Sequence, residues 1–202
     1  MRDKVVDHIM IQIEKKYGNK YDETKLLEIR YGLCGVYTIF TKSVVVFLIA
    51  IILNMLNYFF IFLLFYILLR SVGYGTHAES KIQCWIFSCL LMLGLPYIFN
   101  ILELGTITNI IIWAICFINF VIFCPADTVK RPMINKKRKL KFKLCIIVLS
   151  LIYLVLILNF SNIANYIIAA MILEAFLTNP IGYLCMGQKI RFGKYKNGME
   201  GK

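Results

Sequence analysis

Long apolar runs separated by short polar segments fill most of the chain from Val36 to Leu184. The first run, 36–69, has about 34 residues, which exceeds the ~20 that one transmembrane helix needs and predicts two short helices. Asn54 and Asn57 mark the turn between these two helices. Four further spans are expected at about 84–99, 106–124, 144–160 and 163–184.

The N-terminal segment, residues 1–35, has a different pattern, with seven basic and six acidic residues. Its apolar residues at helical spacing are Val5, Ile9, Ile13 and Tyr17, with Val6 and Met10 alongside. This pattern predicts an amphipathic helical segment on the membrane surface. The first long apolar run begins only near Gly35, so we expect no cleavable signal peptide.

Composition agrees with a membrane protein. Hydrophobic residues make up 60% of the chain and charged residues only 17%, whereas soluble domains carry about 25% charged residues. High hydrophobicity also excludes a disordered chain. The net charge of +12 is interpreted as an orientation signal, because cytoplasmic loops of membrane proteins collect Lys and Arg. We therefore expect the lipid bilayer, and no nucleic acid, as a partner.

The positive charge is concentrated in residues 125–143, which include eight basic residues and one Asp. Placing this basic loop in the cytoplasm also places both termini and the polar break at 70–83 there, while the opposite connections carry a single charge, Glu103. The sequence thus predicts an all-α polytopic membrane protein with about six transmembrane helices and both termini cytoplasmic. Its amphipathic segment, transmembrane domain and basic tail are expected at 1–35, 36–184 and 185–202.

The cysteines and histidines limit the chemistry. Seven cysteines is an odd number, and most lie in or beside apolar runs, so no disulfide framework is expected. The two histidines, His8 and His77, are far apart, and the chain has neither a CxxC pair nor HExxH spacing. We therefore expect no metal site and no cofactor.

A nucleophilic thiol near a base is the chemistry that the chain can offer. His77 lies in the polar break seven residues before Cys84, and imidazole suits the role of general base near neutral pH. On a straight helix the two would stand ~10 Å apart along the axis, so the chain between them must bend. Gly73 and Gly75 make a non-helical approach to His77 plausible.

Two helix starts compete after His77. Ser80 with Gln83 forms a capping box that would place Cys84 in the first turn of the next helix, where a thiolate is favoured. Thr76 with Glu79 would start the helix earlier and hold His77 and Cys84 apart. We favour the Ser80 start.

Other polar residues have alternative roles. Arg70 and Lys81 flank the His77 and Cys84 pair and could bind a substrate carboxylate or an oxyanion, or could anchor the cytoplasmic side. Glu174 lies near the middle of the last span, where an ionised carboxylate is unfavourable, so it should face the helix bundle. The asparagines expected to form interhelical hydrogen bonds are Asn109, Asn119 and Asn165.

These residues resemble the accessory gene regulator B (AgrB) family of quorum-sensing membrane endopeptidases. The residues and motifs that carry the resemblance are Arg70, Gly73, Gly75, His77-Ala78, Cys84, Pro125-Ala126-Asp127-Thr128, Arg131-Pro132 and the following Lys/Arg cluster. The resemblance covers nearly the whole chain, including its size and the number of spans.

The resemblance implies a cysteine endopeptidase of the bacterial cell membrane, with Cys84 as nucleophile and His77 as base. Its substrate would be a short AgrD-like precursor peptide with an amphipathic start and an acidic C-terminal tail. Removal of the tail would leave a thioester on the enzyme, and cyclisation would give a thiolactone or lactone autoinducing peptide. A homo-oligomer is left open by the sequence.

The basic loop could attract the acidic tail of such a precursor through its charge. The residues considered for this role are Lys130, Arg131, Lys136, Lys137 and Arg138, and Asp127 of the same loop is a further candidate for binding substrate or supporting the site. The same charges could instead anchor the topology and bind anionic lipid.

Two rival functions belong to other classes. A small peptide transporter or exporter could use Glu174 at depth, and it would have no need of a reactive Cys84. A scaffold that binds lipid through the basic loop would need neither His77 nor Cys84.

Overall fold

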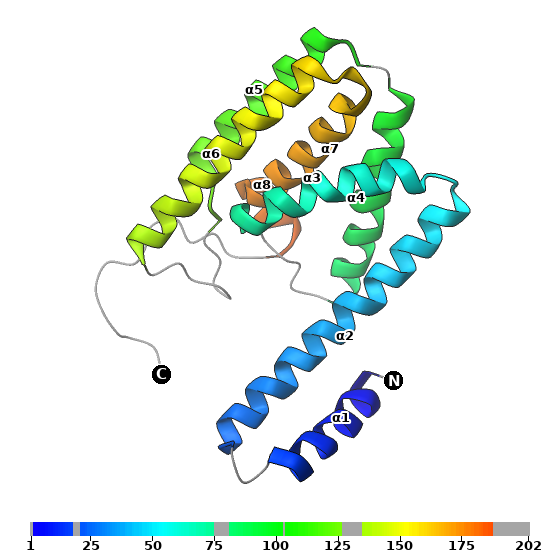
Figure 1. Ribbon diagram of the computed structural model, residues 1–202, viewed down its shortest axis with the longest axis vertical. Coiled ribbons are helices and arrows are strands. Elements are labelled where there is room, and N and C mark those ends of the chain that lie inside the picture. Colours follow the sequence, from blue (N-terminus) through cyan, green and yellow to red (C-terminus); the bar gives the residue numbers. More distant parts are fainter. Residues whose placement is uncertain (1, 18–20, 75–80, 103, 127–134, 188–202) are drawn as a thin grey trace. The chain divides into compact units, whose positions relative to one another are not determined.

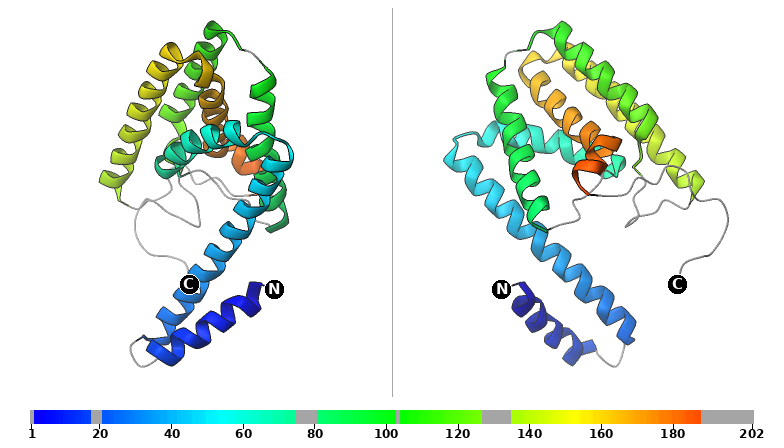
Figure 2. Two further views of the ribbon diagram at one scale, coloured as in Figure 1. Left: turned by 45° about the vertical axis from the view of Figure 1, so that its right-hand side comes forward. Right: turned by 180° about the vertical axis from the view of Figure 1, so that it is seen from behind.

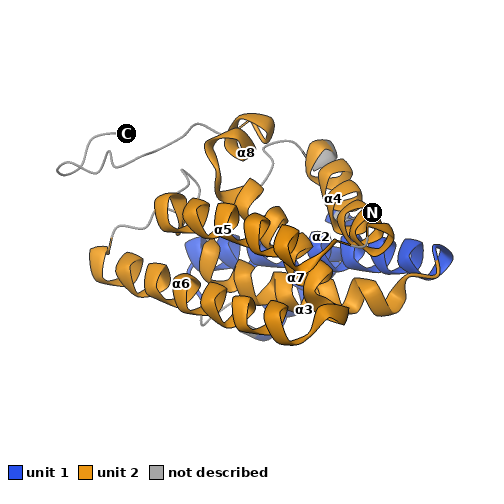
Figure 3. Ribbon diagram, turned by 90° about the horizontal axis from the view of Figure 1, so that it is seen from above, with its two compact units in different colours: residues 1–53 blue, residues 54–202 orange. Residues whose placement is uncertain are grey.

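The computed structural model describes residues 2–17, 21–74, 81–102, 104–126 and 135–187 (Figure 1). All regular secondary structure in these ranges is α-helical, and six of the helices are long and apolar enough to cross a membrane. The chain divides into two compact units, residues 1–53 and residues 54–202 (Figure 3). The predicted all-α fold with six spans is confirmed.

The first unit contains α1 (Arg2–Tyr17) and α2 (Glu23–Ile52), which pack against each other. Val6 and Met10 of α1 are buried, whereas Val5 and Ile9, which belong to the predicted apolar stripe, are partly exposed. The buried face of α1 is therefore the one that carries Val6 and Met10. The predicted boundary at residue 35 lies inside α2. Gly32 and Gly35 lie within α2 and do not interrupt it.

The turn predicted at Asn54 is present. Asn54 has a φ of 53°, a left-handed conformation that asparagine tolerates better than most residues. Asn57, the other residue assigned to this turn, lies instead in the first turn of α3 (Leu56–Gly73).

The second unit is arranged around α7 (Ser161–Thr178), which contacts α3, α4 (Lys81–Ile101), α5 (Thr106–Phe123) and α6 (Lys136–Asn159) (Figure 2). Twelve of its 18 residues are buried. Small side chains such as Ala169 and Ala170, both fully buried, let neighbouring helices approach closely, as is common in membrane bundles. The helix that carries Glu174 is therefore the central element of this unit.

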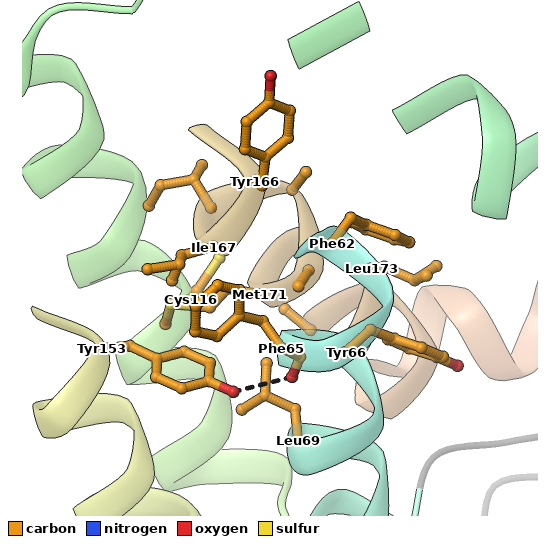
Figure 4. Packing of buried hydrophobic residues seen from close by; sticks show 14 of the residues in the cluster. Phe62, Phe65, Tyr66, Leu69, Cys116, Tyr153, Tyr166, Ile167, Met171 and Leu173 are labelled. Atoms are coloured by element: carbon orange, nitrogen blue, oxygen red, sulfur yellow. Dashed lines mark hydrogen bonds between the residues drawn. The ribbon is translucent and has the colours of Figure 1, made fainter. Parts of the chain in front are cut away.

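Aromatic residues of α3 and α6 pack beside α7 (Figure 4). The Tyr153 hydroxyl donates a hydrogen bond to the Phe65 carbonyl at 2.8 Å, and the two rings meet edge to face with centroids 5.3 Å apart. Buried tyrosines need such a partner for the hydroxyl, and the backbone oxygen supplies it.

Two span boundaries differ from those expected. α6 begins at Lys136 rather than near 144, because Asn135 caps it by accepting hydrogen bonds from the amides of Lys137 and Arg138. The last span ends at Thr178 rather than near 184. Asn179 then caps a separate short helix, α8 (Pro180–Cys185), in which proline occupies the first position.

Gly182 allows α8 to pack against the end of α7. A Cβ at this position would coincide with the carbonyl oxygen of Phe176 and stand 2.9 Å from its carbonyl carbon. Moving these backbone atoms to make room for a Cβ would cost considerable free energy. Only glycine fits this approach.

We predict that Gly182→Ala lowers the free energy of unfolding by about 1–3 kcal/mol, because the added methyl group overpacks a backbone contact. Thermal unfolding in detergent micelles, followed by circular dichroism, measures the change. Gly94→Ala in α4 is the matched control, since a Cβ there has open space and should leave stability equal or higher. An equal effect of both substitutions would contradict the role of Gly182.

Candidate functional site

A buried ion pair joins α3 to α7. Arg70 Nη1 lies 3.6 Å from Glu174 Oε2, and the Arg70 side chain is 19% exposed whereas that of Glu174 is 0% exposed. An ionised carboxylate at this depth requires a positive partner, because the lipid and protein around it solvate charge poorly. The prediction that Glu174 faces the bundle is confirmed.

The carboxylate of Glu174 also lies against Gly73, the last residue of α3. A Cβ on Gly73 would coincide with Glu174 Oε1 and would stand 3.0 Å from Cδ. The Gly73 carbonyl accepts a hydrogen bond from the Ala126 amide at 3.0 Å, which ties the segment after α5 to the same point. Gly73 is therefore required for close packing, in addition to the backbone freedom inferred from the sequence.

Cys84 lies on α4, the helix that follows α3 in the chain. The described part of α4 begins at Lys81, so Cys84 stands in its first described turn, where it is partly buried. Tyr66, one turn before Arg70 on α3, is buried. The helix that carries Cys84, α4, contacts both α3 and α7, the two helices joined by the ion pair.

A second cysteine, Cys124, lies directly after α5 and is buried. Burial raises the pKa of the Cys124 thiol, and the nearby carboxylate of Glu174 raises it further. The hydroxyl of Thr178, on the α7 turn after Glu174, donates to the Glu174 carbonyl at 2.9 Å. Cys124 is therefore a protonated packing group.

The start of α6 contacts the end of α3 through three side chains, which we call the Tyr74 clasp: Tyr74, Arg138 and Phe142. The rings of Tyr74 and Phe142 meet edge to face with centroids 4.8 Å apart. Arg138 Nη2 donates to the Tyr74 hydroxyl at 3.4 Å, and the guanidinium carbon lies 5.6 Å from the Phe142 ring centroid. This contact connects the basic segment with the residue that follows Gly73.

The structure places only some of the predicted site residues. Residues outside its described part are Gly75, His77, Asp127, Lys130 and Arg131, and the choice between the Ser80 and Thr76 helix starts lies there too. Lys81 is described for its backbone alone. Lys136, Lys137 and Arg138 are exposed in the first turn of α6.

Sequence reasoning missed three members of the cluster around Glu174: Tyr66, Cys124 and Thr178. Spacing could have suggested two of them, since Tyr66 is four residues before Arg70 and Thr178 four after Glu174. Among the described residues, no group of three or more His, Cys, Asp or Glu side chains could hold a metal ion.

The asparagines predicted to bond between helices do so. Asn109 donates to Asn165 at 3.1 Å, and Asn165 donates to the Leu102 carbonyl at 3.0 Å. Asn119 Oδ1 lies 3.3 Å from the hydroxyl of Thr178, from which it accepts a hydrogen bond. These bonds connect α5 and the end of α4 to the central helix α7.

Comparison with known proteins gives a consistent result over nearly the whole chain. The sequence model of the family "Accessory gene regulator B" matches residues 6–178. An accessory gene regulator protein B of Staphylococcus aureus (strain bovine RF122 / ET3-1) is 27% identical over 179 residues, covering 89% of this chain and 95% of that protein. A putative AgrB-like protein of Listeria innocua is 28% identical over 186 residues, covering 88% of each chain. No solved structure matches the chain.

The ion pair gives a testable asymmetry. Arg70→Gln should lower the free energy of unfolding by about 3–5 kcal/mol, because it leaves the fully buried carboxylate without its partner. Glu174→Gln should cost less, since Arg70 is partly exposed and can turn toward water. The double variant should cost less than the sum of the two. Thermal unfolding in detergent micelles measures all three.

Arg30→Gln is the control for loss of an ion pair as such. Arg30 lies 2.7 Å from Asp7, but both side chains are 50% exposed, so its removal should cost at most about 1 kcal/mol. If Arg70→Gln and Arg30→Gln had the same small effect, the buried pair would not be a major constraint on the fold.

Proposed function

The chain belongs to the accessory gene regulator B family, and from this premise we propose that it is a membrane cysteine endopeptidase that processes a short precursor peptide for quorum sensing. Cys84 is the nucleophile and His77 the general base. The observation that carries the proposal is the position of Cys84, a partly buried thiol in the first described turn of α4, a helix that contacts both α3 and α7.

The proposed reaction exchanges one acyl bond for another. His77 takes the thiol proton, and the sulfur of Cys84 attacks the carbonyl carbon of the scissile peptide bond. The C–N bond breaks, His77 returns the proton to the leaving amine, and the acidic tail departs. An internal thiol or hydroxyl of the peptide then attacks the thioester, which closes the ring and regenerates the Cys84 thiol. The net change is one amide replaced by one thioester or ester.

The surroundings of Cys84 support this role. If the helix begins at Ser80, as favoured from the sequence, Cys84 lies in its first turn, where the unpaired amides and the dipole stabilise an anion. Cys124, the nearby alternative nucleophile, is buried, and its raised pKa keeps it protonated. Cys84 is only partly buried and is therefore the more accessible of the two thiols.

The proposal includes an orientation in the bacterial cell membrane. The protein is a multi-pass membrane protein by its six apolar helices and its family. We place both termini, the start of α6 and Cys84 on the cytoplasmic side, because Lys and Arg accumulate there. A cytoplasmic precursor would then meet Cys84 at the membrane surface, and its acidic tail would meet the basic segment.

We predict that Cys84→Ala and His77→Ala each abolish release of the precursor tail while leaving the protein in the membrane, because nucleophile and base act as one unit. Co-expression with the precursor, followed by mass spectrometry of the peptide, measures processing. Cys89→Ala is the matched control, since Cys89 is also partly buried on α4. Processing retained by Cys84→Ala would exclude Cys84 as nucleophile.

The orientation has a separate test. Single cysteines at positions 137 and 161, introduced in a background without the native cysteines, should differ in their labelling by a membrane-impermeant maleimide. In intact cells the cysteine at 161 should react and that at 137 should react only after permeabilisation. Labelling of position 137 in intact cells would reverse the assigned topology.

A further inference from the structure

We propose that Arg138 is the residue of the basic segment that recognises a carboxylate of the precursor's acidic tail, and that Tyr74 and Phe142 hold its side chain in the binding position. This inference rests on the proposed function, because the acidic tail belongs to the precursor. It assigns specificity to one oriented side chain rather than to the summed charge of the segment.

The Tyr74 clasp restrains the guanidinium from two directions. The Tyr74 hydroxyl accepts a hydrogen bond from Nη2 at 3.4 Å, and the Phe142 ring lies below the guanidinium at 5.6 Å. Tyr74 and Phe142 are themselves packed edge to face, at 4.8 Å between centroids and 67° between planes. The side chain is thus held by a structure that is already formed.

Both contacts of Arg138 are with neutral groups, so neither compensates its positive charge. Within the described part of the chain, no carboxylate lies within ion-pair distance of this guanidinium. The fork of N–H donors matches the two oxygens of a carboxylate, and such bidentate bonds are among the stronger polar contacts in proteins. An acidic side chain is therefore the ligand that this group favours.

The side chains of the neighbouring lysines are not held in place as that of Arg138 is. Lys136 and Lys137 are exposed, and in the described ranges their ammonium groups have neither a hydrogen bond nor an ion pair. A free lysine loses up to about 2 kcal/mol of side-chain entropy when it is fixed by a ligand, whereas Arg138 has already lost much of that freedom. The lysines therefore contribute non-specific electrostatic attraction, whereas Arg138 contributes a specific contact with a carboxylate.

The backbone at the start of α6 does not offer an alternative site. Asn135 Oδ1 accepts from the amides of Lys137 and Arg138, at 3.0 and 3.4 Å. These amides are thus already satisfied by the cap. The donors available to an anion here are side chains.

The position of the clasp relates recognition to the chemistry. Tyr74 follows Gly73, which contacts the Glu174 carboxylate, and Arg70 lies one turn earlier on the same helix. The clasp therefore lies at the end of α3 that carries the ion pair. In the proposed topology this end and Cys84 at the start of α4 face the same side of the membrane, so a tail carboxylate held by Arg138 would keep the peptide on the side of the nucleophile.

The first test measures binding and does not need catalysis. The full-length Cys84→Ala protein is reconstituted in zwitterionic lipid vesicles, and the probe is a synthetic amphipathic peptide ending in a run of glutamates, with a glutamine version as reference. Arg138→Gln should raise Kd for the glutamate peptide about tenfold. Lys137→Gln, which removes the same charge one residue away, should raise it only about twofold to threefold.

Two further variants separate orientation from charge. Tyr74→Phe keeps every charge and the ring but removes the hydroxyl, and it should raise Kd for the glutamate peptide about twofold to threefold with the salt dependence unchanged. Arg138→Lys should stay near Arg138→Gln, because an ammonium group cannot form the bidentate contact. None of the variants should change Kd for the glutamine peptide.

The second test uses the protein with Cys84 intact and follows tail release. Arg138→Gln should raise KM and leave kcat within about twofold, since the contact is made before the chemical step. The inference would be overturned if Arg138→Gln and Lys137→Gln raised Kd equally and Tyr74→Phe left Kd unchanged. That result would favour attraction by the summed charge of the basic segment. A lower kcat at unchanged KM would overturn it in favour of a structural role. Failure of wild-type tail release would reject the proposed function alone, because the binding test decides on Arg138 by itself.

Discussion

The burial of the Glu174 carboxylate is the constraint from which the arrangement of the second unit follows. A charge buried between the last turns of two helices must be compensated locally, and Arg70 supplies the compensation at 3.6 Å. This requirement fixes which face of α7 meets α3 and at what height along each helix. It also explains Gly73, because any side chain there would occupy the place of the carboxylate. The register of the two helices therefore depends on a polar contact, while the surrounding apolar contacts alone would tolerate other registers.

Cys124 and Cys84 differ in exposure. Cys124, directly after α5, is buried, and this burial raises the pKa of its thiol. Cys84, in the first described turn of α4, is only partly buried. Burial therefore distinguishes the two thiols, although both residues are cysteines at the ends of apolar helices.

The sequence predicted those features that depend on local physical limits. The length of a bilayer span determines the number of helices, and the unfavourable hydration of a buried carboxylate determines that Glu174 faces inward. The partner of Glu174 was not predicted, because the pairing of α3 with α7 joins residues far apart in the chain. The start of α6 was misplaced because the apolar run marks the membrane boundary, whereas Asn135 sets where the helix begins. The end of α7 before Pro180 was not predicted, because the residues on both sides of Pro180 are mostly apolar and form one continuous apolar run.

The order of the helices along the chain has a consequence for biogenesis. α7 is the least apolar of the six candidate spans and carries the buried acid, so it is the span that lipid alone would accept least readily. α3 is synthesised first, and Arg70 in its last turn can wait at the lipid headgroups with its long side chain extended toward water. When α7 leaves the translocon, the counter-charge for its carboxylate is therefore already in the membrane. Insertion of α7 becomes an assembly step, in which the helix enters a pocket of preceding spans rather than bulk lipid.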